Sequence, residues 1–247
     1  MELLCGDIIF NGIHEHPRYH STHIIHSLNP YLSINTFRFL LMNSITHTTK
    51  FREPEKIVDD IINEAELFNY YFSEIEKMTF KEVLLNYLNH IQQHDNLDLR
   101  GPIFEQIMRF SGPIHKDIDD YNPINHSLEE VKVYSEKRKY NNGDSNKDVD
   151  IVFFPACSEG FQWFLAYELK VNLNNFIKSI FIAIESGQKM NMNNNYQKLM
   201  YLKKMRNTFN DIGLIGICYL SDLQKEVHDF IKEHFNDLIL CNPLFET

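Results

Sequence analysis

Apolar side chains recur every three to four residues through most of the first hundred positions of the chain, which is the spacing of amphipathic helices. Three segments carry this pattern: residues 31–45, 52–75 and 79–91. Pro54 suits the first turn of the second segment, and Thr79 with Glu82 forms a T-x-x-E capping box for the third. The pattern predicts a helical N-terminal subdomain over residues 1–98.

The pattern changes after Leu99, where segments with strand-like alternation follow one another between clusters of turn residues. A short helix is expected first, at residues 101–111. Strands are then predicted at residues 131–140, 148–155, 161–171 and 212–220. Helices are predicted at residues 174–209 and 221–235. The order helix, strand, strand, strand, helix, strand, helix predicts an α/β (α+β) core over residues 99–247.

One of the predicted strands carries two charges that packing does not explain. Residues 163–172, WFLAYELKVN, are almost entirely apolar apart from Glu168 and Lys170. Because side chains alternate across a strand, both charges project from the same face. Asp150 opens the preceding strand, and a tight hairpin would bring its carboxylate to that face. Two carboxylates and a lysine suit Mg²⁺ binding and hydrolysis of a phosphodiester by a metal-activated water.

These residues resemble the active-site motif of the PD-(D/E)XK nuclease superfamily, to which many restriction endonucleases and DNA repair nucleases belong. The match consists of Asp150, the triplet Glu168-Leu169-Lys170 and the order of the elements around them. The resemblance implies a restriction-endonuclease-like core, with a central mixed β-sheet flanked by helices. It also implies that Asp150, Glu168 and the backbone carbonyl of Leu169 bind Mg²⁺ or Mn²⁺. Lys170 would then be the catalytic lysine.

Two further parts of the superfamily pattern have counterparts in the chain. Members often carry a glutamate on the first core helix, and Glu105 occupies that place. Some branches have a Gln-x-x-x-Tyr motif on the helix after the lysine strand, which Gln197 and Tyr201 match. Glu105 and Gln197 are therefore candidate catalytic residues. The second motif lies within residues 187–206, which hold five basic residues and no acidic ones. The predicted nucleic-acid contacts are Tyr201, Lys198, Lys203, Lys204 and Arg206.

Other residues compete for the metal-binding roles. Asp148 shares a face with Asp150 and is the alternative ligand from that strand. Val149 stands where the superfamily motif has a proline before the aspartate. A second D/E-x-K triplet, at residues 130–132, has no acidic residue opening a strand shortly before it. It is therefore a weaker candidate for the active-site triplet than residues 168–170.

Structural roles compete with the remaining assignments. A position on the solvent face of a helix would account for Glu105, and helical periodicity with packing beside Leu202 would account for Tyr201. Five histidines between residues 14 and 26 have spacings that suit zinc, but neither a cysteine nor an HExxH pattern accompanies them. Histidines in a loop before a helix are the simpler interpretation.

Composition narrows the class of protein. The net charge is −10, with 7 Lys/Arg against 14 Asp/Glu in residues 1–98 and 17 against 20 in residues 99–247. The net negative charge argues against a polyanionic partner, but the modest positive charge within the second half predicts phosphate contacts focused in a groove and not a wholly basic surface. No segment approaches the roughly 20 apolar residues that cross a bilayer, and the N-terminus lacks the basic region of a signal peptide. The four dispersed cysteines favour separate reduced thiols and a cytoplasmic protein.

The function expected from these observations is that of a Mg²⁺- or Mn²⁺-dependent nuclease acting on DNA, of a restriction, repair or defence type. The alternative is a catalytically inactive nuclease-like scaffold that binds nucleic acid or protein. A homodimer would supply two sites for the two strands of a duplex. The helices of residues 1–98 would recognise the substrate, regulate access to the site or form the dimer.

Overall fold

The computed structural model describes residues 2–5, 8–13, 23–48, 52–93, 97–115, 118–135, 137–138, 140, 147–155 and 163–245. The chain forms two compact units. One unit combines Met1–His16 with Gly112–Glu246 and contains the β-sheet. The other, Pro17–Ser111, is helical. Among the described residues, no helix has the length and apolar character needed to cross a membrane.

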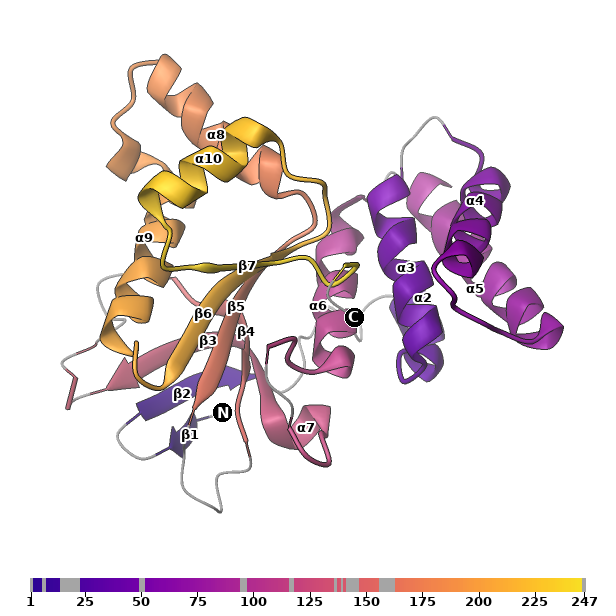
Figure 1. Ribbon diagram of the computed structural model, residues 1–247, viewed down its shortest axis with the longest axis horizontal. Helices are drawn as coiled ribbons and strands as arrows, with labels where there is room; N and C mark the ends of the chain where they lie inside the picture. Colours follow the sequence, from indigo (N-terminus) through magenta and orange to yellow (C-terminus); the bar gives the residue numbers. More distant parts are fainter. Residues whose placement is uncertain are drawn as a thin grey trace. The chain divides into compact units, whose positions relative to one another are not determined.

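The sheet unit is built on a mixed sheet whose described strands lie side by side in the order of the sequence (Figure 1). The strands are β1 (Glu2–Cys5), β2 (Ile8–Ile13), β3 (Ser127–Ser135), β4 (Val149–Phe153), β5 (Phe164–Lys170), β6 (Gly213–Tyr219) and β7 (Ile239–Cys241). Neighbours from β1 to β5 are antiparallel, whereas β5, β6 and β7 are parallel. The predicted α/β class and the mixed sheet flanked by helices are confirmed.

Helices make the crossovers that parallel strands require (Figure 1). The helices of this unit are α7 (Pro123–His126), α8 (Leu173–Glu185), η5 (Met190–Met192), α9 (Asn194–Thr208) and α10 (Lys225–His234). Asn172 and Asn193 cap α8 and α9, because each side chain accepts hydrogen bonds from backbone N–H groups of the first turn. The helical segment predicted over residues 174–209 is therefore divided, because α8 ends at Glu185 and Asn193 starts α9.

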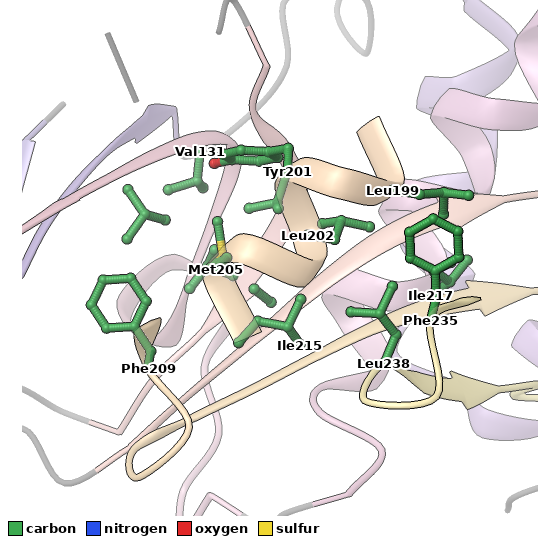
Figure 2. Close-up of a cluster of buried hydrophobic side chains, with 14 of the residues drawn as sticks. Val131, Leu199, Tyr201, Leu202, Met205, Phe209, Ile215, Ile217, Phe235 and Leu238 are labelled. Carbon is green, nitrogen blue, oxygen red and sulfur yellow. The ribbon is translucent and has the colours of Figure 1, made fainter. Parts of the chain in front are cut away.

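The core of the sheet unit lies between one face of the sheet and α8, α9 and α10. Phe164 and Ala166 of β5 belong to this face, and Glu168 and Lys170 continue it toward the end of the strand. Figure 2 shows side chains of α9, including Leu202 and Met205, packed against those of β6. The core thus fixes β5, the strand that carries Glu168, relative to α9.

The helical unit consists of helices that pack around buried apolar side chains of their own. They are α2 (His23–Leu28), η1 (Asn29–Tyr31), α3 (Asn35–His47), α4 (Pro54–Leu67), α5 (Glu74–Gln93), η2 (Leu97–Leu99) and α6 (Arg100–Ser111). The capping box predicted at Thr79 is wrong, because α5 begins earlier and the Thr79 hydroxyl donates to Ile75 O within the helix. Ser73 and Glu76 cap this helix instead, through reciprocal hydrogen bonds of 2.8 and 3.3 Å.

The division of the chain differs from the boundary predicted at residue 98. Residues 2–5 and 8–13 form two strands of the sheet, and Phe10 of β2 pairs with Val133 of β3. The helix α6, predicted to open the nuclease-like core, belongs to the helical unit, where it packs against α3. Pairing between strands more than a hundred residues apart leaves no local pattern in the sequence.

The cysteines also differ from the prediction of four separate thiols. Cys218 and Cys241 occupy paired positions on β6 and β7, with their Cα atoms 4.9 Å apart, and their sulfurs form a disulfide. Both residues are fully buried. Cys157 and the side chain of Cys5 lie outside the described part of the chain.

Candidate active site

The strand register places the predicted carboxylates opposite each other. Ile151 pairs with Tyr167, and Val152 pairs with Ala166. Continuing this antiparallel register by one residue sets Asp150 opposite Glu168. The backbone N–H of Leu169 donates to Asp150 Oδ2 at 2.6 Å, which holds the aspartate toward β5.

Three oxygen atoms surround the ammonium group of Lys170. Its Nζ atom lies 3.4 Å from Asp150 Oδ2, 2.6 Å from Glu168 Oε1 and 3.0 Å from Leu169 O. These are the three residues that the sequence predicted to bind a metal ion. The ring of Phe176, at the start of α8, lies 5.3 Å from the same ammonium. The structure therefore gathers the predicted ligands around a single cation.

Lys198 of α9 contacts the same glutamate from the other side. Its Nζ atom lies 2.8 Å from Glu168 Oε2 and 3.5 Å from Asp148 Oδ1. The contact with Oε2 is an ion pair that lacks the alignment of a hydrogen bond. The charges consequently alternate along one continuous cluster, which we call the charged cluster: Asp148, Lys198, Glu168, Lys170 and Asp150.

Burial sets the protonation behaviour of the charged cluster. The Glu168 side chain is only 3% exposed, and this burial, together with the nearby charge of Asp150, raises its pKa against the opposing effect of the two lysines. Burial by itself lowers the pKa of Lys170, but the charges of Asp150 and Glu168 outweigh it and the net direction is upward. The pKa of Lys198 is raised by Glu168 and Asp150 in the same way. Both lysines therefore stay charged at neutral pH.

The donor atoms fit a hard divalent cation. Carboxylate and carbonyl oxygens are the preferred ligands of Mg²⁺, which often takes one or two protein carboxylates and completes its shell with water. Asp150, Glu168 and the carbonyl of Leu169 form such a set. Within the part of the chain that the structure describes, no group of three His, Cys, Asp or Glu side chains has metal-binding geometry. An ion at this point would have two carboxylates and one carbonyl from the protein, and the ammonium of Lys170 would move aside.

The interpretation of the charged cluster rests on its own geometry. Comparison with known proteins gave no match, whether with family models, curated proteins or solved structures. The contacts themselves show that two strands and one helix converge on a buried glutamate. They also show that oxygens of Asp150, Glu168 and Leu169 already contact a cation, the ammonium of Lys170.

The predicted glutamine is turned away from the site. Gln197 Nε2 donates to the backbone carbonyl of Asn191 at 2.9 Å, in the segment before α9. The next residue, Lys198, reaches Glu168 instead. Sequence reasoning assigned Lys198 to nucleic-acid binding and missed this role. The available signal was its position early in the helix that follows the lysine strand.

Tyr201 and Glu105 are not part of the charged cluster as described. Tyr201 is buried in the core of the sheet unit, where its ring lies near that of Tyr140 (Figure 2). Its predicted contact with nucleic acid stays a prediction, and in this structure other side chains cover the residue. Glu105 lies on α6 in the helical unit, whereas the charged cluster is formed entirely within the sheet unit.

Most of the basic residues of α9 have structural partners. Lys203 Nζ donates to His234 O at 2.8 Å. Arg206 donates to Gly213 O at 3.0 Å and to Asp237 O at 3.2 Å, which ties α9 to the ends of β6 and the segment before β7. Lys204 is exposed, with its ammonium 5.6 Å from the centre of the Tyr140 ring. Most of the basic side chains that were predicted to contact phosphates along α9 therefore contact other parts of the protein instead.

The competing motifs do not form a second site among the described residues. In the other triplet, Glu130 is exposed and has a φ of 49°, which departs from regular strand geometry, and Val131 is buried in the core. Of the five histidines, His23 and His26 are exposed on α2 of the helical unit. The other three lie outside the described residues.

Proposed function

We propose that this protein is a metal-dependent nuclease with a restriction-endonuclease-like core, which hydrolyses phosphodiester bonds in DNA. The observation that carries the proposal is the convergence of Asp150, Glu168 and the Leu169 carbonyl on one cation, the Lys170 ammonium. The order of elements within the sheet unit adds support, because β3, β4, β5, α8 with α9, β6 and α10 follow the predicted order.

Every residue of the charged cluster except Asp148 has a role in this proposal. Asp150 and Glu168 would hold Mg²⁺ or Mn²⁺, which supplies a polarised phosphate oxygen and a water of lowered pKa. The N–H of Leu169 fixes the orientation of Asp150. The Lys170 ammonium, which contacts both carboxylates, would orient the attacking water, help to deprotonate it or stabilise charge that develops on the phosphate.

Lys198 is a positioning residue in the same proposal. It pairs with the Glu168 oxygen that faces away from Lys170 and so holds the carboxylate on both sides. Its charge also favours the ionised form of a glutamate whose pKa burial raises. Only the ionised carboxylate binds a divalent cation, so Lys198 would support metal binding without touching the metal.

A cleavage assay tests the proposal. Supercoiled plasmid, linear duplex, single-stranded DNA and RNA are incubated with the protein and Mg²⁺ or Mn²⁺, and in parallel with a chelator. We expect cleavage of DNA that depends on the metal, and a loss of about 100-fold or more in Asp150→Asn and Glu168→Gln. Asp148→Asn is the matched control and should retain activity within about tenfold, since Asp148 lies outside the three oxygens around Lys170. Metal-dependent cleavage by a folded Glu168→Gln protein would contradict the site assignment.

A non-catalytic scaffold is the second candidate, favoured by one specific observation. Both oxygens of Glu168 already face lysine ammonium groups, so the buried charge has partners within the protein. A scaffold of this kind would bind no divalent cation and would bind nucleic acid equally well in chelator. Calorimetric titration with Mn²⁺ separates the two candidates, because the nuclease proposal requires binding that Glu168→Gln removes.

A further inference from the structure

An exposed apolar surface lies where α4 ends and α5 begins. Five of the twelve large apolar side chains that are exposed among the described residues fall within residues 67–78. Their exposed fractions are 83% for Leu67, 54% for Phe68, 83% for Tyr71, 79% for Ile75 and 73% for Met78. Clustered exposed apolar side chains often mark an interaction site, whereas apolar side chains that are exposed singly are common on any protein. We call these five residues the 67–78 surface.

Inward-facing neighbours hold the 67–78 surface in place. Tyr70 stacks on Phe39 of α3 with ring centres 4.3 Å apart, and Phe72 contacts the ring of Phe80 at 6.3 Å. The connection thus turns two aromatic rings into the helical core while Phe68 and Tyr71 stay largely exposed. The exposed rings are therefore presented by an anchored segment.

Two polar contacts fix the helices on either side of the connection. Lys77 of α5 pairs with Glu66 of α4 at 2.6 Å. Ser73 caps α5 and exchanges hydrogen bonds with Glu76. These contacts set the spacing of the 67–78 surface before any partner binds, which lowers the entropy lost on binding.

The charge around the 67–78 surface is strongly negative. Residues 53–82 contain nine Asp/Glu and three Lys. Three of those carboxylates have basic partners within the unit: Glu66 pairs with Lys77, Asp59 with Lys81 and Asp60 with Arg52, and six of the nine carboxylates remain. Glu74 and Glu82 are exposed and stand four residues before and four residues after Met78, which places both beside it on the helix.

The negative charge around the 67–78 surface favours some binding partners over others. A second copy of the chain docked face to face would bring acidic rims together, and like charges across an interface cost binding free energy. An anionic lipid surface is disfavoured for the same reason. A basic partner with apolar anchors satisfies both the apolar centre and the acidic rim.

We propose that the 67–78 surface docks an amphipathic, basic segment of another protein. The apolar stripe of the segment would bury Tyr71, Ile75 and Met78, and its Lys or Arg residues would face Glu74 and Glu82. Helices recognised in this way present apolar residues at i, i+3, i+4 and i+7. The inference is independent of the nuclease proposal, because no residue of the charged cluster takes part in it.

The test uses the full chain and two labelled peptides. Both are 18-residue alanine-rich helical peptides with leucines at i, i+3, i+4 and i+7; one carries four lysines beside the leucines and the other carries four glutamates at the same positions. Fluorescence anisotropy should show binding of the lysine peptide that weakens with salt, and about tenfold or more weaker binding of the glutamate peptide.

Variants of the chain locate the binding. Tyr71→Ser with Ile75→Ser should weaken binding of the lysine peptide about tenfold or more, and Glu74→Lys with Glu82→Lys should do the same. Ile182→Ser with Ile184→Ser is the matched control, because these side chains of α8 are 64% and 40% exposed outside the 67–78 surface. Equal binding by the Tyr71/Ile75 variant, or equal binding of the glutamate peptide, overturns the proposal.

Two further measurements exclude the other occupants. Sedimentation of the unliganded chain should show a species whose mass does not depend on Tyr71 and Ile75. Flotation with phosphatidylserine vesicles should show no binding that these two substitutions remove. A dimer, or vesicle binding, that is lost in Tyr71→Ser with Ile75→Ser would assign the 67–78 surface to that occupant and overturn the proposal.

Discussion

At the scale of single residues, adjacent positions on α9 have different environments. Gln197 matched a superfamily motif, yet it bonds to the backbone before its own helix, and Lys198 contacts the buried glutamate. Neighbouring residues on a helix point about 100° apart, so a letter pattern cannot show which of them faces the sheet. The three residues on the strands were easier to predict, because alternation on β5 fixes Glu168 and Lys170 on one face.

We predict that Lys198 and Glu168 are energetically coupled. Lys198→Met removes one of the two cations beside a buried carboxylate, and it should lower the free energy of unfolding by about 2–4 kcal/mol. In a Glu168→Gln background the same substitution should cost at least about 1 kcal/mol less, since no buried charge is left without its partner. Urea unfolding of the two single variants and the double variant measures the coupling. Strictly additive costs would show that the contact is unimportant.

We also predict that cation binding is sensitive to pH in the mildly acidic range. A proton on Glu168 competes with a metal ion, and the raised pKa of this buried carboxyl places that competition above the ordinary glutamate value of about 4.3. Mn²⁺ affinity measured by calorimetry should fall about tenfold or more between about pH 7.5 and pH 5.0. Equal affinity at the two pH values would contradict a ligand role for Glu168.

The same group affects folding stability with a definite sign. A carboxyl with a raised pKa binds its proton more tightly in the folded state than in the unfolded state. Its contribution to stability is therefore fully present at low pH and is lost as the pH rises through the raised pKa of Glu168. Glu168→Gln should remove this part of the pH dependence in urea unfolding at a series of pH values.

At the scale of elements, the sequence located most helices and strands but not all of their ends. The segment predicted as one helix over residues 52–75 is divided, because α4 ends at Leu67 and Asn69 adopts a φ of 62°. Left-handed backbone of this kind commonly ends a helix. The basic character of α9 was visible in the sequence, but its carbonyl partners on other elements were not.

Arg206 tests the structural interpretation of α9. Its guanidinium bonds to the carbonyls of Asn210, Gly213 and Asp237, so Arg206→Ala should lower the free energy of unfolding by about 1–3 kcal/mol. Lys189→Ala is the matched control, because Lys189 is an exposed cation of the same basic stretch and its loss should change stability by less than about 0.5 kcal/mol. Weaker DNA binding by Arg206→Ala without a change in stability, with DNA binding unchanged in Lys189→Ala, would restore the predicted phosphate role of Arg206.

At the scale of the whole molecule, the chain passes from the sheet unit into the helical unit and back again. The first two strands precede the helices in sequence but pair with β3, which follows them. Ile8 and Phe10 are fully buried in the core of the sheet unit. The core of the sheet unit is therefore built from residues before the helical unit and from residues after it.

A pair of fragments tests this organisation. Residues 99–247 alone lack Ile8 and Phe10, and the loss of two large buried side chains costs about 3–5 kcal/mol each. We expect this fragment to unfold at a lower urea concentration than a chain in which residues 1–16 are joined by a flexible linker to residues 112–247. Circular dichroism follows both transitions. Equal midpoints would show that β1 and β2 add nothing to the sheet unit.

The sequence by itself determined the class of the fold, the order of the elements after residue 99, and the face that carries Glu168 and Lys170. These follow from local rules, because the period of apolar residues and the alternation of a strand act over a few positions. Only the tertiary structure decided that β1 and β2 join the sheet, that Lys198 faces Glu168, and that Tyr201 is buried. Those outcomes depend on contacts between residues far apart in the chain, where register and helix orientation are set by packing of the whole core.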